Sequence, residues 1–330
     1  MKEVLEKLYQ GEKLNRQESN DILLKIGHNS FSEIEIASFL TVFLMREITP
    51  QELAGFRDAL LQLCIPVDLS GFETIDVCGT GGDGKNTFNI STISSFVLAG
   101  AGIKVAKHGN YGVSSPVGSS NILEHFGYRF TNDQGKLRKE VEHAGITYMH
   151  APLFHPAMKY VAPVRRALRT KTFFNMLGPM INPASPTYQL TGVYSMKVQD
   201  LYSLVFSQTS IQFLILHGLD GYDEISLTGD VKVVSGNSEE IINSATFGFK
   251  PITQNSLFGG NTISDAATIF LNVLNNQCTL EQKQVVMANS AAAIRCIHPY
   301  YSWEECVVTA NQSIESGKAL QSFKKLISLQ

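Results

Sequence analysis

Apolar residues recur every three or four positions through the first sixty-odd residues, the spacing of helices with one buried face. Three start signals share capping-box spacing: Asn15 with Glu18, Ser32 with Glu35, and Thr49 with Glu52. Pro50 strengthens the last of these signals, because proline suits the first helical position. One apolar stripe consists of Ile36, Phe39, Leu40 and Phe43. This stripe either packs inside the chain or forms a dimer seam, and the pattern alone leaves both open.

Short apolar runs alternate with helical segments after about residue 68. The expected strands are residues 74–78, 103–106, 146–149, 189–194, 211–216 and 232–234. The expected helices among the first strands are residues 92–101, 120–125 and 133–144. Such alternation is typical of an α/β fold, in which helices cover a mostly parallel sheet. Residues 155–177 differ from their neighbours, because prolines interrupt their helical pattern.

Composition narrows the function classes. The length of 330 residues favours about two domains. A net charge of −3 argues against nucleic acid as the main partner, because nucleic-acid-binding proteins usually carry a basic excess. The five cysteines form no Cys-x-x-Cys pair, so neither a zinc knuckle nor a disulfide framework is expected. No apolar stretch reaches the roughly 20 residues of a membrane span, and the N-terminus has no signal-peptide pattern. We therefore expect a soluble cytoplasmic protein without a membrane partner.

A glycine-rich segment, Gly79-Thr-Gly-Gly-Asp-Gly84, follows an expected strand and precedes an expected helix. It is close to a P-loop, but Asn86 stands where Ser or Thr would hold Mg²⁺, and Asp83 would repel a phosphate in the cradle. A dinucleotide site would place an acid at the tip of the next strand. The next strand ends instead in Lys107-His-Gly-Asn110, which suits an anion. Two such loops at neighbouring strand ends predict one anion-binding cleft at the carboxyl edge of the sheet.

The chain resembles the anthranilate phosphoribosyltransferases in several blocks, which follow that family's order and spacing. The blocks are Gly79-Thr-Gly-Gly-Asp83, Phe88-Asn-Ile-Ser-Thr92, Lys107-His-Gly-Asn110, His155-Pro-Ala-Met-Lys-x-Val-Ala-Pro-Val-Arg165, Asn175-x-Leu-Gly-Pro179 and Asp220-Gly-Tyr-Asp-Glu-Ile-Ser226. The resemblance implies a helical domain over 1–68, joined by an excursion around 155–178, and an α/β domain over 69–330 of the nucleoside phosphorylase and phosphoribosyltransferase type. It also implies a homodimer joined through the helical domains, for which the apolar stripe is the expected interface.

The implied reaction transfers the phosphoribosyl group of phosphoribosyl pyrophosphate (PRPP) to the amine of anthranilate, in tryptophan biosynthesis, with Mg²⁺ as cofactor. The resemblance assigns to PRPP the residues Gly79, Gly82, Asp83, Thr87, Asn89, Ile90, Ser91, Thr92, Lys107, His108, Gly109, Asn110, Tyr111, Gly112, Val113, Ser114, Ser115 and Ser119. It assigns to the metal Ser91, Asp223 and Glu224. It assigns to anthranilate Gly79, Asn110 and Arg165.

The chemistry of these residue types agrees with the reaction. Departure of pyrophosphate leaves negative charge on the leaving group, which Mg²⁺ and backbone N–H groups stabilise. Adjacent carboxylates such as Asp223 and Glu224 suit Mg²⁺, although alone such a pair is usually a surface turn. Arg165 offers a guanidinium fork for a carboxylate, although Arg165-Arg166 alone would be read as a solvated face. The attacking aromatic amine is neutral and needs no strong base, so His108 is as much a structural histidine as a catalytic candidate.

Two positions depart from the family pattern. Tyr111 stands where an arginine is expected, and Asn121 where an aspartate is usual. The first departure removes a cation from the pyrophosphate loop, and Lys85 and Lys107 are the cations available to compensate. The alternatives are a pyrimidine nucleoside phosphorylase, a catalytically silent paralogue that binds nucleic acid, and a nucleotide hydrolase. Asn86 argues against the last of these, and the paired acids argue against the silent paralogue.

Overall fold

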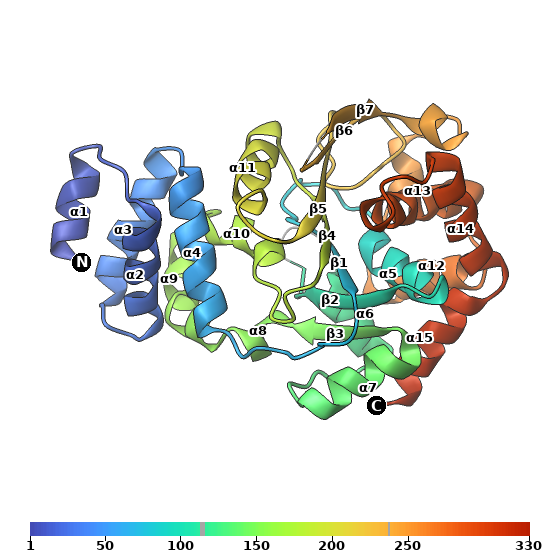
Figure 1. Cartoon of the computed structure of the whole chain (residues 1–330), viewed down its shortest axis with the longest axis horizontal. Coiled ribbons are helices and arrows are strands. Elements are labelled where there is room, and N and C mark those ends of the chain that lie inside the picture. Colours follow the sequence, from blue (N-terminus) through green and yellow to red (C-terminus); the bar gives the residue numbers. More distant parts are fainter. Residues whose placement is uncertain (113–115, 237) are drawn as a thin grey trace. The chain divides into compact units, whose positions relative to one another are not determined.

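The computed structural model describes residues 1–112, 116–236 and 238–330, which form two compact units (Figure 1). The helical unit comprises residues 1–67 and 151–185. The α/β unit comprises residues 68–150 and 186–330. The chain therefore leaves the helical unit, builds part of the sheet, and returns before the sheet is complete. No helix among the described residues is long and apolar enough to cross a membrane.

The helical unit is built from short helices that begin at the expected signals. Its elements are α1 (Lys2–Tyr9), α2 (Arg16–Gly27), α3 (Glu33–Met45), α4 (Pro50–Leu63), α8 (Ala151–Phe154), η1 (Pro156–Tyr160), α9 (Ala162–Leu168), α10 (Phe174–Leu177) and η2 (Gly178–Met180). Helices α2, α3 and α4 each start with a complete capping box, at Asn15, Ser32 and Thr49. The predicted start signals are confirmed. Prolines divide the returning segment into brief helical turns, as its sequence pattern indicates.

The apolar stripe of α3 lies inside the helical unit. Phe39 is fully buried and Phe43 nearly so. The ring of Phe43 lies 5.1 Å from that of Phe173 and 5.5 Å from that of Phe56. Phe56 and Phe173 are stacked, with ring centroids 4.4 Å apart. Ile36 and Leu40 are buried as well, so the prediction that this stripe forms a dimer interface is wrong.

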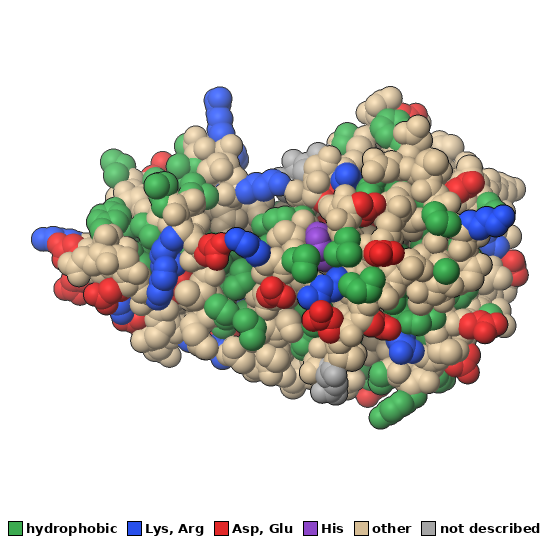
Figure 2. Space-filling view, turned by 90° about the horizontal axis from the view of Figure 1, so that it is seen from above, with side chains coloured by type: hydrophobic (Ala, Val, Ile, Leu, Met, Phe, Trp, Pro, Cys, Tyr) green, Lys and Arg blue, Asp and Glu red, His purple; other side chains and the backbone are tan. Residues whose placement is uncertain are grey.

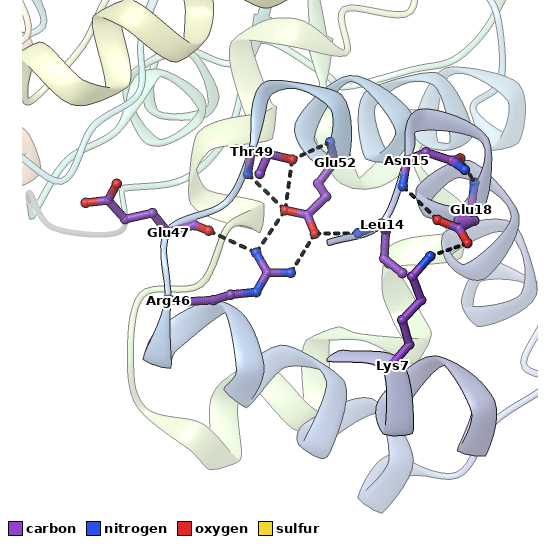
Figure 3. Close-up of polar contacts among 8 residues, drawn as sticks. All are labelled: Lys7, Leu14, Asn15, Glu18, Arg46, Glu47, Thr49 and Glu52. Carbon is purple, nitrogen blue, oxygen red and sulfur yellow. Dashed lines mark hydrogen bonds and ion pairs between the residues drawn. The ribbon is translucent and has the colours of Figure 1, made fainter. Parts of the chain in front are cut away.

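Glu52 ties the start of α4 to two other parts of the helical unit (Figure 3). Its carboxylate is fully buried and accepts hydrogen bonds from both terminal nitrogens of Arg46, at 2.9 and 2.5 Å. It also accepts the backbone N–H groups of Leu14 and Thr49 and the Thr49 hydroxyl. A buried carboxylate needs such partners, because it has lost its water. Figure 3 shows beside it the same capping motif at Asn15 and Glu18, where Lys7 is the cation.

The α/β unit contains one seven-stranded sheet of order β3-β2-β1-β4-β5-β6-β7. Its strands are β1 (Thr74–Gly79), β2 (Lys104–Gly109), β3 (Ile146–His150), β4 (Tyr188–Gly192), β5 (Gln212–Gly218), β6 (Val231–Ser235) and β7 (Glu239–Ile242). Neighbours from β3 to β5 are parallel, and β6 and β7 add an antiparallel edge. The expected mostly parallel sheet is confirmed. Strand β7 was not among the expected strands, because its four residues, Glu-Glu-Ile-Ile, do not alternate between polar and apolar.

Helices cover this sheet. They are α5 (Ile90–Gly100), α6 (Ser119–His125), α7 (Gln134–Ala144), α11 (Met196–Phe206), α12 (Ile263–Leu274), α13 (Leu280–Ile297), α14 (Trp303–Glu315) and α15 (Lys318–Ser328), with the short turns η3 (Ser244–Phe247) and η4 (Gln254–Leu257). Helix α13 packs against both α5 and β4 and is buried without a break from Val285 to Ile294. The core thus holds the ends of β1 and β2 in place, where the two glycine-rich loops begin.

Candidate functional site

The first glycine-rich loop joins β1 to α5 and carries the predicted residues Gly79, Gly82, Asp83, Thr87 and Asn89. Gly81 and Gly82 have φ of +64° and +81°, a backbone conformation that other residues rarely adopt. A Cβ atom at Gly79 would lie 2.4 Å from Oδ2 of Asp223. The glycines therefore let the backbone of this loop approach a carboxylate closely.

The loop between β5 and β6 brings Asp223 and Glu224 to the first loop. Asp223 Oδ2 accepts the N–H of Gly81 at 2.7 Å, and Glu224 Oε1 accepts the N–H of Ser91 at 3.1 Å. Burial, with Asp83 adding like charge, raises the pKa of Asp223 to about 7. Burial, with Asp223 and Asp83, raises the pKa of Glu224 well above its ordinary value. Three mutually repelling acids at one loop make a site that a cation would stabilise.

This donor set fits a magnesium ion that arrives with a phosphate group. Among the described residues, no group of three or more His, Cys, Asp and Glu side chains is arranged as a complete metal cage. Magnesium does not require one, because it commonly uses one or two carboxylates together with substrate phosphates and water. The three residues predicted to hold the metal are close to one another: Asp223 and Glu224 are consecutive, and the Glu224 carboxylate contacts the backbone of Ser91.

The second loop follows β2 and carries the predicted residues Lys107 to Gly112. Lys107 is buried, and its ammonium donates to the carbonyl oxygen of Val77 at 2.5 Å. Burial lowers the pKa of Lys107, against the opposing charges of Asp76, Cys78 and Glu224. This cation therefore lies beneath the loops, near the acids. His108 is buried too, and its backbone N–H donates to Asp76.

The two loops are connected directly. Asn89 Nδ2 donates to the carbonyl oxygen of Val117 at 3.1 Å. Ile90 and Thr92 lie in the first turn of α5, and their side chains are buried. Asn110, Tyr111 and Gly112 are exposed, and Ser119 begins α6. Val113, Ser114 and Ser115 lie outside the described residues.

Both departures from the family pattern have local partners. Asn121 Oδ1 accepts the N–H groups of Gly112 and Gly118, at 3.1 and 2.9 Å. An amide oxygen thus supplies the acceptor that a carboxylate would. The Tyr111 hydroxyl reaches both carboxylate oxygens of Glu124 at 3.4 Å, and its ring lies 4.9 Å from that of His150. Lys85 lies over the ring of Tyr222, beside the acids.

Arg165 lies in α9 of the helical unit and has no carboxylate partner among the described residues. One of its terminal nitrogens donates to Asn175 Oδ1 at 3.2 Å, and its guanidinium lies 5.6 Å from the centre of the Phe174 ring. Burial lowers its pKa. Its Nε is buried without a hydrogen bond, whereas Arg166 is exposed. A half-buried guanidinium of this kind can accept an anionic ligand.

Two family models match the chain. The "Glycosyl transferase family, a/b domain" covers residues 71–320, and the "Glycosyl transferase family, helical bundle domain" covers residues 2–64. A relative from Bacteroides thetaiotaomicron, named anthranilate phosphoribosyltransferase, is 50% identical over 100% of this chain and 99% of its own length. One of the same name from Christiangramia forsetii is 51% identical over 99% of this chain and 98% of its own. The chain belongs to the anthranilate phosphoribosyltransferase family.

Solved structures of the anthranilate phosphoribosyltransferases agree. The enzyme from Thermus thermophilus matches with a TM-score of 0.92 and 28% identity, over 98% of each chain. The enzyme from Saccharomyces cerevisiae, "in complex with PRPP and Mg", matches with a TM-score of 0.92 and 26% identity, over 98% of this chain and 96% of its own. The fold and family implied by the sequence blocks are confirmed. Neither the nucleoside phosphorylase nor the silent paralogue is favoured.

Sequence reasoning missed several polar residues beneath the second loop. Asp76 is fully buried in β1, and Tyr148, Ser120 and His150 form a buried cluster at β3 and α6. A charged residue within the apolar run 74–78 was a signal for the first. The others carried no signal, because their contacts join segments that are distant in sequence.

Proposed function

We propose that this chain transfers the phosphoribosyl group of PRPP to the amine of anthranilate and releases pyrophosphate, a step of tryptophan biosynthesis. Family membership supports the reaction. The observation that carries it in the structure is the meeting of the first glycine-rich loop with Asp223 and Glu224. Backbone N–H groups and carboxylates at one place suit a metal-bound polyphosphate.

The proposed PRPP site consists of the two loops. The phosphates would be held by Gly79, Gly82, Asp83, Thr87 and residues 89–92 of the first loop, and by residues 107–115 and Ser119 of the second. Lys107 would offset the charge of the acids from below. Mg²⁺, held by Ser91, Asp223 and Glu224, would neutralise charge that develops on the departing pyrophosphate. The protein's own contribution is then to position the ribose carbon and to stabilise charge. His108 stays a candidate without an assigned step.

The proposed anthranilate contacts are Gly79, Asn110 and Arg165. Anthranilate carries one carboxylate and one neutral amine, so it requires a cation and a polar partner. The lack of a carboxylate partner supports Arg165 as the cation, since a guanidinium binds a carboxylate through two parallel hydrogen bonds.

We also propose a homodimer joined through the helical units, and a location in the cytoplasm. Five large apolar residues of the helical unit are exposed: Tyr9, Ile34, Leu44, Met45 and Ile65. They replace the buried stripe as the expected interface. All five cysteines are free thiols, as is usual in a reducing compartment. Cationic and acidic side chains are interspersed on the face in Figure 2, which supports small-molecule substrates over nucleic acid.

The test follows the intrinsic fluorescence of anthranilate. The signal should fall only when protein, PRPP and Mg²⁺ are all present. The double variant D223N/E224Q should lose activity by about 100-fold or more, because the metal loses both carboxylates. Normal turnover in the double variant would remove these acids from the reaction.

Stability provides the control for this experiment. The raised pKa of Asp223 means that its charged form costs folding free energy, and this cost grows as the pH rises through about 7. D223N should therefore be at least as stable as the unchanged protein at pH 8, with a smaller advantage at pH 6. Thermal unfolding at both values, without Mg²⁺, measures this difference. Loss of activity in a folded variant then reflects the site.

A further inference from the structure

A linear series of hydrogen-bonding groups lies beneath the second loop, in the α/β unit. The buried Tyr148 hydroxyl lies 2.8 Å from Ser119 Oγ and 2.7 Å from Ser120 Oγ. On one side, Ser120 Oγ lies 2.8 Å from Nδ1 of His150. On the other side, Ser119 Oγ lies 3.3 Å from the backbone carbonyl oxygen of Asn110. The series thus runs from β3 to the exposed loop.

Gly109 makes room for this series. A Cβ atom at residue 109 would lie 2.4 Å from both Ser119 Oγ and the Tyr148 hydroxyl. Gly109 pairs with His150 in the register of β2 and β3, so Tyr148, two residues before His150, points to the same face of the sheet. The backbone of the loop, the first turn of α6 and β3 therefore meet at one point.

The available protons give this series one direction. The carbonyl oxygen of Asn110 has no proton, so the Ser119 hydroxyl must donate to it. Ser119 then has no proton left and accepts from the Tyr148 hydroxyl. Tyr148 has spent its single proton in turn, so it accepts from Ser120. Ser120 can then only accept from His150, which must carry a proton on Nδ1.

The surroundings of His150 are consistent with a single imidazole proton. Its ring is stacked on Phe130 at 4.3 Å and meets the edge of Tyr111 at 4.9 Å. Burial lowers the pKa of His150, against the charge of Glu124, so the ring is neutral at pH 8. A neutral ring bears its proton on one nitrogen only, and the series selects Nδ1.

We propose that Tyr148 is a positioning residue for PRPP, which directs the Ser119 hydroxyl toward the Asn110 carbonyl and so fixes the start of α6 against the second loop. This inference rests on the proposed function, in which Ser119 and Asn110 belong to the substrate site. Tyr148 itself touches no substrate. Tyr148 acts through Ser119. Because the Tyr148 hydroxyl donates its proton to Ser119 Oγ, the Ser119 hydroxyl proton stays directed at the Asn110 carbonyl oxygen.

The first experiment observes the proton directly. Protein labelled with ¹⁵N at histidine, at pH 8, is examined by long-range ¹H–¹⁵N correlation, and the His150 signals are identified by their loss in His150→Gln. We expect Nδ1–H in the unchanged protein. In Tyr148→Phe the Ser120 hydroxyl is free to donate to His150, so the proton should move to Nε2. A proton on Nε2 in the unchanged protein would overturn the direction of the series.

The second experiment measures steady-state kinetics with both substrates. Tyr148→Phe should raise the KM for PRPP about two- to tenfold, the range for one lost hydrogen bond, with the KM for anthranilate unchanged within about twofold. Tyr128→Phe is the matched control. Its hydroxyl is also buried, but it donates to the Glu140 carboxylate and to the backbone carbonyl oxygen of Tyr148 and not to Ser119 or Ser120, so the KM values of this variant should not change.

The variant Ser119→Ala distinguishes the positioning role of Tyr148 from the proposed PRPP site that includes Ser119. A raised KM for PRPP in Ser119→Ala but not in Tyr148→Phe would overturn the inference and leave the proposed site standing. An unchanged KM in both variants would remove Ser119 from the proposed site, and the inference with it. Equal changes in Tyr148→Phe and Tyr128→Phe would show a general loss of packing and would also overturn it.

Discussion

The two capping motifs of the helical unit form a natural pair for measuring what burial does to a charged cap. Glu52 and Glu18 occupy the same capping-box position, and each binds one cation. The Glu52 side chain is fully buried, whereas that of Glu18 is 38% exposed. The substitutions Glu52→Gln and Glu18→Gln make the same chemical change at both places. They keep one oxygen acceptor and remove the charge.

The expected costs differ several-fold. Glu52→Gln leaves the Arg46 guanidinium, only 15% exposed, without its counter-charge and turns an amide nitrogen toward donors. Removing one partner of a buried ion pair lowers the free energy of unfolding by about 3–5 kcal/mol. Because glutamine keeps one oxygen acceptor, we expect a loss of about 3 kcal/mol in Glu52→Gln. At Glu18 water replaces the lost partner, and an exposed pair contributes about 0.5 kcal/mol.

Urea unfolding separates these values. Far-UV circular dichroism follows all helices, while fluorescence of Trp303, the single tryptophan, follows the α/β unit. Glu52→Gln should move the circular dichroism transition to lower urea, with Glu18→Gln close to the unchanged protein. Similar losses in the two variants would refute the argument that burial sets the cost.

The pH dependence gives an independent check. Burial acts to raise the pKa of Glu52, but the hydrogen bonds from Arg46, Thr49 and Leu14 outweigh it, and the pKa lies below its ordinary value of 4.5. A lowered pKa stabilises the folded protein above about pH 4.5, and this contribution is lost as the pH falls further. The stability difference between Glu52→Gln and the unchanged protein should therefore shrink from pH 7 to pH 4. A constant difference would contradict this reasoning.

Two further predictions concern substrate binding and assembly. Arg165→Ala should raise the KM for anthranilate about ten- to hundredfold, because a charged hydrogen bond is lost, while Arg166→Ala, at an exposed neighbour, should not. Separate saturation curves decide this, and equal effects on both substrates would mean that Arg165 does not serve anthranilate. Met45→Glu should turn a micromolar dimer into a monomer in sedimentation, whereas Tyr300→Glu, on the α/β unit, should not. A monomeric unchanged protein would contradict the proposed interface.

Local signals in the sequence were reliable where the structure is local. The helix starts at Asn15, Ser32 and Thr49 were predictable, because a capping box is complete within four residues. The parallel direction of the first strands was predictable from their alternation with helices. The two loops were predictable as well, because their glycines stand directly after strands.

Features that depend on distant partners were not predictable. The stripe of α3 looked equally suitable for a core and for an interface, and Phe173, which covers it, lies far along the chain. The acids at Asp223 and Glu224 were assigned by resemblance, since spacing alone does not bring them to Gly81 and Ser91. Tyr148 meets Ser119 because β3 pairs beside β2 and α6 begins close to the end of β2, an arrangement that no local pattern in the sequence encodes.

The division of the helical unit between two segments has a consequence for synthesis. Phe39, Phe43 and Phe56 are translated early, but Phe173 follows only after β1, β2 and β3 have been made. On the ribosome, the first helices therefore wait with an incomplete aromatic cluster while the start of the sheet emerges. The order of translation thus couples the maturation of the two units, because the nascent helical segment keeps part of its aromatic cluster uncovered until residue 173 arrives.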